Sequence, residues 1–187
     1  MPAHTTPSNE TAHDIAADVI HLLNHAGQTV GVAESMTAGM VMSALSSVPG
    51  ASDAFRGGIV TYATPLKQTL LGVDAGLIER EGVVHPDVAE QMAQGARRAT
   101  NPAAADGTAP PTTWGIGTTG VAGPDPQDGK PVGTVYIGIA SPDGAKAWGP
   151  FMFSGPCERI REATVMETLA KLREALVAAA GQREKAE

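Results

Sequence analysis

The sequence has few cysteines, few basic residues and no long apolar runs, and each shortage argues against one kind of structure or binding partner. Cys157 is the single cysteine among 187 residues, which excludes an intramolecular disulfide and suits a reducing cytosol. Lys and Arg number 13 against 20 Asp and Glu, and the net charge of −7 argues against broad nucleic-acid binding. No apolar run approaches a membrane span, and the N-terminus lacks a secretion signal. We therefore expect a soluble, cytoplasmic protein with no nucleic-acid or membrane partner.

The length indicates one domain with its own core. Residues 1–10 contain Pro2, Pro7 and several Thr and Ser, which predicts a disordered lead-in. The folded domain is expected over residues 11–181, and the charged residues 182–187 are expected to fray.

Hydrophobic periodicity and turn signals predict an alternation of helices and strands. Strands are expected at residues 29–32, 59–62, 113–119, 132–140 and 146–153, and helices at 11–26, 40–45, 64–71, 74–80, 85–99 and 158–180. Residues 48–53 and 101–112 have the composition of a turn and a loop. Helices would then flank a mixed sheet whose early strands are parallel and whose last two form a hairpin. The predicted fold is a single-domain, three-layer α/β/α sandwich.

The stretch around Ser35 is the best candidate for a reactive site. A buried strand runs into a helix through Glu34-Ser35 and the turn at residues 37–39. A helix N-terminus carries unpaired N–H donors and partial positive charge, which suit an anion or a developing oxyanion. Ser35, at the tip of this turn, is therefore a candidate nucleophile. The alternative is that Ser35 or Thr37 only caps the helix.

A serine hydroxyl needs a base, and Lys67 is a candidate for that base. No histidine has a triad context, and a Gly-x-Ser-x-Gly motif is absent. Lys67 has Leu66, Leu70 and Leu71 as neighbours, so burial would lower its pKa and permit a serine–lysine mechanism. The alternative is an ordinary solvated lysine. Tyr62, at the end of a predicted strand, either supports the reaction or simply has its hydroxyl in water.

Two further patterns give weaker signals. The glycine-rich turn at residues 119–124 would offer backbone donors to a phosphate, although it matches neither the P-loop nor the dinucleotide fingerprint. His21 and His25 have the spacing of a metal pair, but no Cys or carboxylate stands at a matching position. We expect no metal.

Several motifs occur together in one order, at residues 33–39, 48–52, 55–62, 67, 70–73, 119–124 and 130–136. In this respect the chain resembles the CinA C-terminal domain family, whose characterised members are nicotinamide-nucleotide amidohydrolases. The similarity runs from about Thr11 to about Ala180. It implies a compact α/β/α domain that hydrolyses nicotinamide mononucleotide to nicotinate mononucleotide and ammonia. No metal or other cofactor is implied, and we expect a homo-oligomer.

The resemblance also implies roles for individual residues. The family's nucleophile falls on Ser35, and its supporting tyrosine and lysine fall on Tyr62 and Lys67. The residues expected to bind substrate lie in the same motifs and near the start of the last helix: Glu34, Thr37, Gly39, Arg56, Gly57, Thr119, Gly120, Ala122, Gly123, Arg159 and Arg161.

The chain departs from the family pattern in two places. Met36 and Ala38 stand where Cys and Gly are usual; Met36 would narrow the pocket, and Ala38 predicts a right-handed backbone at this turn. Pro156-Cys157 replace Asp-Arg, which removes a cation expected near the substrate phosphate unless Arg159 replaces it from another direction. Two other functions stay open: a nucleotide-binding module without turnover, and a regulatory protein tied to competence or DNA damage.

Overall fold

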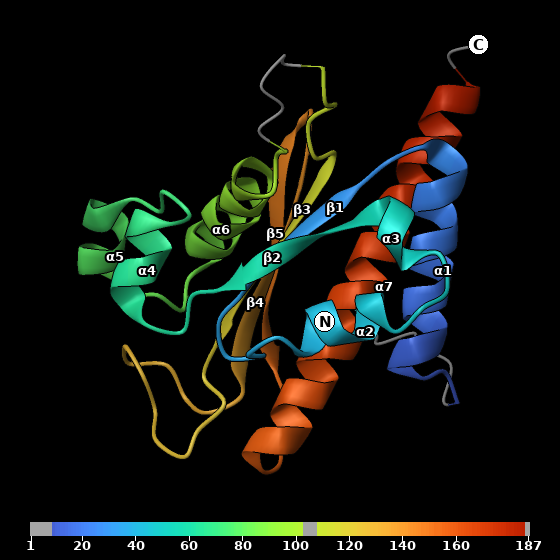
Figure 1. Cartoon of the computed structure of the whole chain (residues 1–187). Helices are drawn as coiled ribbons and strands as arrows, with labels where there is room; N and C mark the ends of the chain where they lie inside the picture. The colour runs from blue at the N-terminus through green and yellow to red at the C-terminus, as the bar shows by residue number, and fades with distance from the viewer. Residues whose placement is uncertain (1–8, 103–107, 186–187) are drawn as a thin grey trace.

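One five-stranded mixed sheet forms the centre of the computed structural model, which describes residues 9–102 and 108–185 (Figure 1). Its strand order is β2-β1-β3-β4-β5. The pairs β2–β1 and β1–β3 are parallel, whereas β3–β4 and β4–β5 are antiparallel. The strands are β1 (Val30–Glu34), β2 (Phe55–Val60), β3 (Trp114–Gly120), β4 (Thr134–Ser141) and β5 (Gly144–Met152). The mixed sheet and its late hairpin confirm the prediction.

Helices cover both faces of the sheet, which gives the predicted three layers (Figure 1). On one face lie α1 (Ala12–Ala26), α2 (Met40–Ser46), α3 (Ala51–Ala54) and α7 (Cys157–Glu184). On the other lie α4 (Thr64–Thr69), α5 (Ala75–Glu81) and α6 (Pro86–Ala99). Across residues 9–102 and 108–185, every helix is too short or too polar to cross a membrane.

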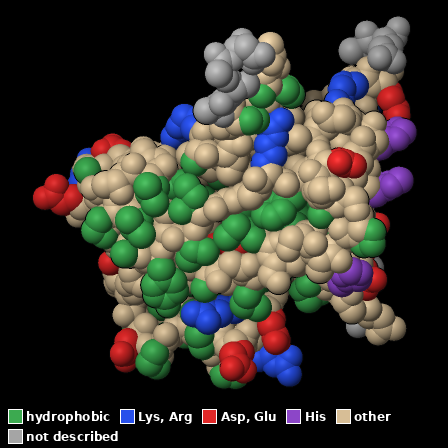
Figure 2. Space-filling view, in the orientation of Figure 1, with side chains coloured by type: hydrophobic (Ala, Val, Ile, Leu, Met, Phe, Trp, Pro, Cys, Tyr) green, Lys and Arg blue, Asp and Glu red, His purple; other side chains and the backbone are tan. Residues whose placement is uncertain are grey.

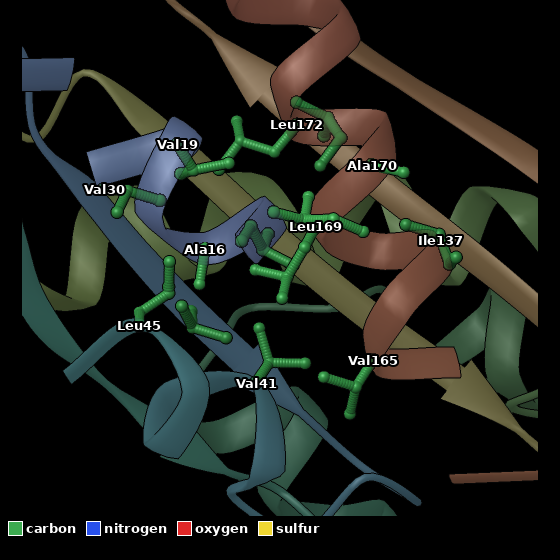
Figure 3. Packing of buried hydrophobic residues seen from close by; sticks show 14 of the residues in the cluster. Ala16, Val19, Val30, Val41, Leu45, Ile137, Val165, Leu169, Ala170 and Leu172 are labelled. Atoms are coloured by element: carbon green, nitrogen blue, oxygen red, sulfur yellow. The ribbon is translucent and has the colours of Figure 1, made fainter. Parts of the chain in front are cut away.

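The main core fills the space between the sheet and the helices α1, α2 and α7. Figure 3 shows Val19 of α1, Val41 of α2 and Leu169 of α7 converging on the strands, and all three are fully buried. Each such side chain stabilises the fold by roughly 1.5–3 kcal/mol. This core holds β1 and the start of α2 in place, and the stretch between them contains Ser35.

On the opposite face, α6 lies directly on the backbone of the sheet. A Cβ atom at Gly115 would collide with the carbonyl oxygen of Ala93, and one at Gly117 or Gly138 with that of Ala89. Only glycine permits this close approach. As a result the N-terminus of α6 is held beside the C-terminal end of β3.

Two boundaries differ from the sequence prediction in the first half of the chain. The predicted turn at residues 48–53 contains the short helix α3, and β2 begins at Phe55 rather than at Ile59. Residues 55–58 have no alternating pattern, but parallel pairing with β1 makes them a strand.

The chain ends also differ from the prediction. The predicted lead-in falls mainly on residues 1–8, which lie outside the described residues, whereas Glu10 forms an ion pair with Arg173 of α7. Arg173 also pairs with Asp18 at 2.7 Å. Helix α7 continues to Glu184, so residues 182–184, expected to fray, are helical.

Candidate active site

Three strands deliver the candidate residues to one edge of the sheet. Ser35 follows directly after β1, Thr61 and Tyr62 follow β2, and Gly120 ends β3. Because these strands are parallel, their carboxyl ends meet at the same edge, where open α/β sheets bind their ligands. Segments far apart in the sequence therefore share one site.

Lys67 and Ser35 are in direct contact. The Lys67 Nζ lies 3.0 Å from the Ser35 Oγ and donates to the Thr61 carbonyl oxygen at 2.7 Å. Pro65 lies in the first turn of α4, and this short helix directs the lysine inward. Lys67 is only 1% exposed. The structure therefore has a buried serine–lysine pair instead of a solvated lysine.

Burial changes the acidity of this lysine. Loss of solvent lowers the pKa of Lys67 from 10.5 to about 8, while the negative charge of Asp128 acts in the opposite direction. At neutral pH about a tenth of the molecules would then carry a neutral amine. A neutral amine still donates a proton to the Thr61 carbonyl and keeps its lone pair for the Ser35 hydroxyl.

A small cleft of about 90 Å³ opens beside the pair. The residues that line it come from the three strand ends, from α4, from the segment before α6 and from the loop between β3 and β4: Ser35, Met36, Tyr62, Lys67, Val83, Gly120, Val121, Ala122, Gly123, Asp125 and Gln127. Tyr62 is 62% exposed and stands at the rim. Val60, Leu66 and Leu70 are exposed nearby on β2 and α4, where Figure 2 shows hydrophobic side chains gathered.

Glu34 occupies the N-terminus of α2, where the sequence predicts an anion or an oxyanion. The Glu34 carboxylate is fully buried and accepts N–H groups of Gly39 at 3.0 Å, Val41 at 3.2 Å and Met42 at 2.8 Å. It therefore caps the helix, instead of Ser35 or Thr37. Gly39 takes part in this cap through its N–H, and the Thr37 hydroxyl hydrogen-bonds to Thr118 at 2.9 Å.

Ala38 has a left-handed backbone, with φ of 50°, so the prediction of a right-handed one was wrong. The Ala38 N–H donates to the Ser35 carbonyl at 3.1 Å, which closes a tight turn at residues 35–38. Holding an alanine in this region costs about 1–2 kcal/mol. The turn is retained because the cap by Glu34 and the buried Thr37–Thr118 contact fix it on both sides.

The expected substrate-binding residues of the glycine-rich turn lie at the cleft, except for one side chain. Gly120, Ala122 and Gly123 line it. Thr119 is buried, and its hydroxyl donates to the carbonyl of Val83 at 2.7 Å, so it holds the opposite wall of the cleft.

Arg56 and Gly57 lie at the other end of β2. In the parallel register Gly57 pairs with Gly31, near the start of β1, whereas Val60 pairs with Glu34 at its end. The Arg56 guanidinium donates to the Pro110 carbonyl at 2.7 Å. These two residues therefore do not line the cleft, because they lie at the start of β2 and the cleft lies beyond its end.

The two arginines of α7 do not line the described cleft either. Arg159 is exposed and pairs with Glu162 at 3.1 Å. The Arg161 Nε is buried and has no partner among the described residues. Their predicted contact with a phosphate stays a prediction.

Four contributors to the site were not singled out from the sequence. The Thr61 carbonyl, Val83, Asp125 and Gln127 contact Lys67 or line the cleft. A backbone carbonyl gives no sequence signal. Val83 lies between two predicted helices, and Asp125 and Gln127 lie just beyond the predicted glycine-rich turn.

The fold and this pair define a class: an α/β domain with a buried serine–lysine pair at the carboxyl ends of its parallel strands. Residues 12–176 match the family model described as CinA C-terminal domain. The chain belongs to the CinA C-terminal domain family. It is similar to a CinA-like protein from Frankia casuarinae, with 45% identity over 84% of this chain and 34% of the relative. A CinA-like protein from Anaeromyxobacter sp. is 41% identical over 89% of this chain and 38% of the relative. The chain thus spans about a third of the length of these curated relatives.

Solved structures show the same fold. The competence or damage-inducible protein from Enterobacter asburiae superposes with a TM-score of 0.80 at 27% identity, covering 90% of this chain and 99% of that one. The competence/damage inducible protein from Agrobacterium tumefaciens gives a TM-score of 0.77 at 29% identity, covering 92% and 99%. These neighbours support the single mixed-sheet domain described above.

Proposed function

We propose that this chain is an amidohydrolase that converts nicotinamide mononucleotide to nicotinate mononucleotide and ammonia. The observation that carries the reaction type is the contact of 3.0 Å between the Lys67 Nζ and the Ser35 Oγ, at the edge of a cleft. The nucleotide substrate is inferred from the activity of characterised members of the family.

Ser35 is the nucleophile in this proposal and Lys67 is its base. The Ser35 Oγ attacks the carboxamide carbon, and its proton passes to the neutral amine of Lys67. The C–N bond then breaks, and the protonated lysine returns the proton to the leaving ammonia. A water molecule, deprotonated by the same amine, attacks the acyl-serine ester and releases the carboxylate.

The oxyanion of each tetrahedral intermediate needs N–H donors at the turn. Within the described residues, neither the Met36 N–H nor the Thr37 N–H donates to another group. The N–H of the residue after a nucleophile is a common oxyanion donor. We assign these two groups to the oxyanion, Tyr62 to the rim that contacts the substrate, and residues 120–123 with Arg161 or Arg159 to the phosphate.

The test is ammonia release from nicotinamide mononucleotide by the wild type, Ser35→Ala and Ser52→Ala. Ser52 is an exposed serine of α3 and serves as the control. Ser35→Ala should lose about a thousandfold or more in kcat while it still folds and binds the nucleotide, because a covalent nucleophile is lost. Activity of Ser35→Ala within about tenfold of wild type would contradict the assignment. Wild-type binding without turnover would instead indicate a nucleotide-binding module, and neither binding nor turnover would favour a regulatory role.

A further inference from the structure

The wall of the cleft opposite Ser35 is held by two side chains that clamp one residue. The Asp128 Oδ2 accepts the N–H of Val83 at 2.8 Å, and the Thr119 hydroxyl donates to the Val83 carbonyl at 2.7 Å. Thr119 lies in β3, and Asp128 lies in the loop between β3 and β4. Both backbone polar groups of Val83, which lines the cleft, are thereby fixed.

The contact at Asp128 depends on two unusual backbone conformations. Asp128 has a positive φ of 50°, and Gly82, next to Val83, has φ of 77°. A Cβ atom at Gly82 would collide with the side chain of Asp128. A left-handed aspartate is uncommon, and here it faces a glycine that leaves it room. The loop is therefore shaped to bring this one carboxylate to Val83.

Asp128 also differs from the other ionisable groups near the pair. Tyr62 and Asp125 line the cleft, and the Glu34 carboxylate is bound to the amides of α2. The Asp128 carboxylate is held on Val83 instead, and its negative charge favours the protonated amine of Lys67, in opposition to burial.

We propose that Asp128 is a positioning residue of this active site, which anchors the loop between β3 and β4 on Val83 and places a negative charge next to the cleft that Lys67 lines. The catalytic consequence rests on the proposed function, whereas the anchoring and the effect on Lys67 do not. No contact between Asp128 and substrate is needed.

The test separates the charge from the anchor. Asp128→Asn keeps a carbonyl oxygen for the Val83 N–H and suits a left-handed backbone, but it removes the charge. Asp128→Ala removes both. Asp125→Asn is the matched control, because Asp125 lies in the same loop and lines the same cleft. If Asp128→Asn fails to fold, Asp128→Ser provides a second variant that removes the charge at this position.

The main readout is the titration of Lys67 by NMR with isotopically labelled lysine, which requires no turnover. Lys67 is one of five lysines, and its signal is assigned by its absence in Lys67→Met. Lys67 should titrate at a lower pH in Asp128→Asn than in wild type, and at the wild-type pH in Asp125→Asn. An unchanged titration in Asp128→Asn, or an equal change in both variants, would overturn the proposal.

Activity and stability supply the second readout. In Asp128→Asn the acid limb of the pH profile of kcat/KM should move to lower pH, while the melting temperature stays close to that of wild type. Asp128→Ala should melt at a lower temperature and lose about tenfold or more in kcat/KM, because the cleft wall is no longer fixed. If Asp128→Ala keeps the wild-type melting temperature, the anchor is refuted. The Lys67 titration could move in Asp128→Asn while the pH profile of activity does not. The effect of the Asp128 charge on Lys67 would then be supported, and the proposed role of Lys67 as the base would be contradicted.

Discussion

Replacing Lys67 with methionine should change how the stability of the protein depends on pH. Methionine keeps the length of the side chain but cannot be protonated. In the wild type, the folded state releases the Lys67 proton at a pH of about 8, while the unfolded chain holds it up to about 10.5. Between these values the unfolded state binds more protons, so the stability of the wild type rises with pH.

The size of the effect follows from the lowered pKa. The fall from 10.5 to about 8 corresponds to about 3 kcal/mol, since each pKa unit is worth 1.36 kcal/mol. Below a pH of about 8 the wild type carries this whole cost, because a charged amine is buried. The hydrogen bonds to Ser35 and Thr61 are also lost in the variant, so the test compares how the stability difference changes with pH and not its absolute size.

The assay is urea unfolding of wild type and Lys67→Met at several pH values from about 7 to about 10.5, followed by circular dichroism. As the pH rises across this range, the free energy of unfolding of the wild type should increase relative to that of Lys67→Met by up to about 3 kcal/mol. All other ionisable groups are the same in both proteins and cancel. A difference that stays constant from pH 7 to pH 10.5 would refute the burial argument for Lys67.

Three further predictions test other parts of the site. Ala38→Gly should raise the free energy of unfolding, measured in urea, by up to about 1 kcal/mol. Glycine removes the cost of the left-handed backbone in the folded state, but it also raises the entropy of the unfolded chain, which offsets part of the gain. A loss of stability would contradict the strain assigned to Ala38. Glu34→Gln should lower the free energy of unfolding by about 2 kcal/mol or more, because three N–H groups lose a charged acceptor. The control Glu79→Gln, at an exposed position, should leave the free energy of unfolding nearly unchanged. The wild type should prefer nicotinamide mononucleotide over its phosphate-free riboside by about tenfold or more in kcat/KM, and Arg161→Ala or Arg159→Ala should narrow this preference. If neither does, the phosphate lies elsewhere.

Most of the fold could be predicted because its elements carry local signals. Helix α1 begins after the capping residue Thr11 and ends at Ala26, close to the range of 11–26 that the apolar spacing predicts. The start of β2 could not be predicted, since residues 55–58 become a strand only by pairing with β1. The length of α7 was underestimated, since its last turns are charged and give no apolar pattern.

The site was predictable where burial could be inferred from neighbours. Leucines around Lys67 indicated that its amine would be desolvated, and the structure brings this amine to Ser35, 32 positions earlier in the chain. Glu34 was expected to contact substrate only because it lies in a motif of the family. Its carboxylate is instead consumed by the backbone of α2, a role that depends on how the chain turns after β1. The role of Asp128 depends likewise on a loop whose path no local pattern specifies.

The cap formed by Glu34 has a consequence for what happens after hydrolysis. An amide is neutral when it binds, but its hydrolysis leaves a carboxylate at the same place. An open helix N-terminus beside Ser35 would attract that new anion and slow its departure. Here the positive end of α2 is already neutralised by the Glu34 carboxylate. For an amide cleaved at Ser35, the end of α2 would therefore add no attraction for the carboxylate that the reaction creates.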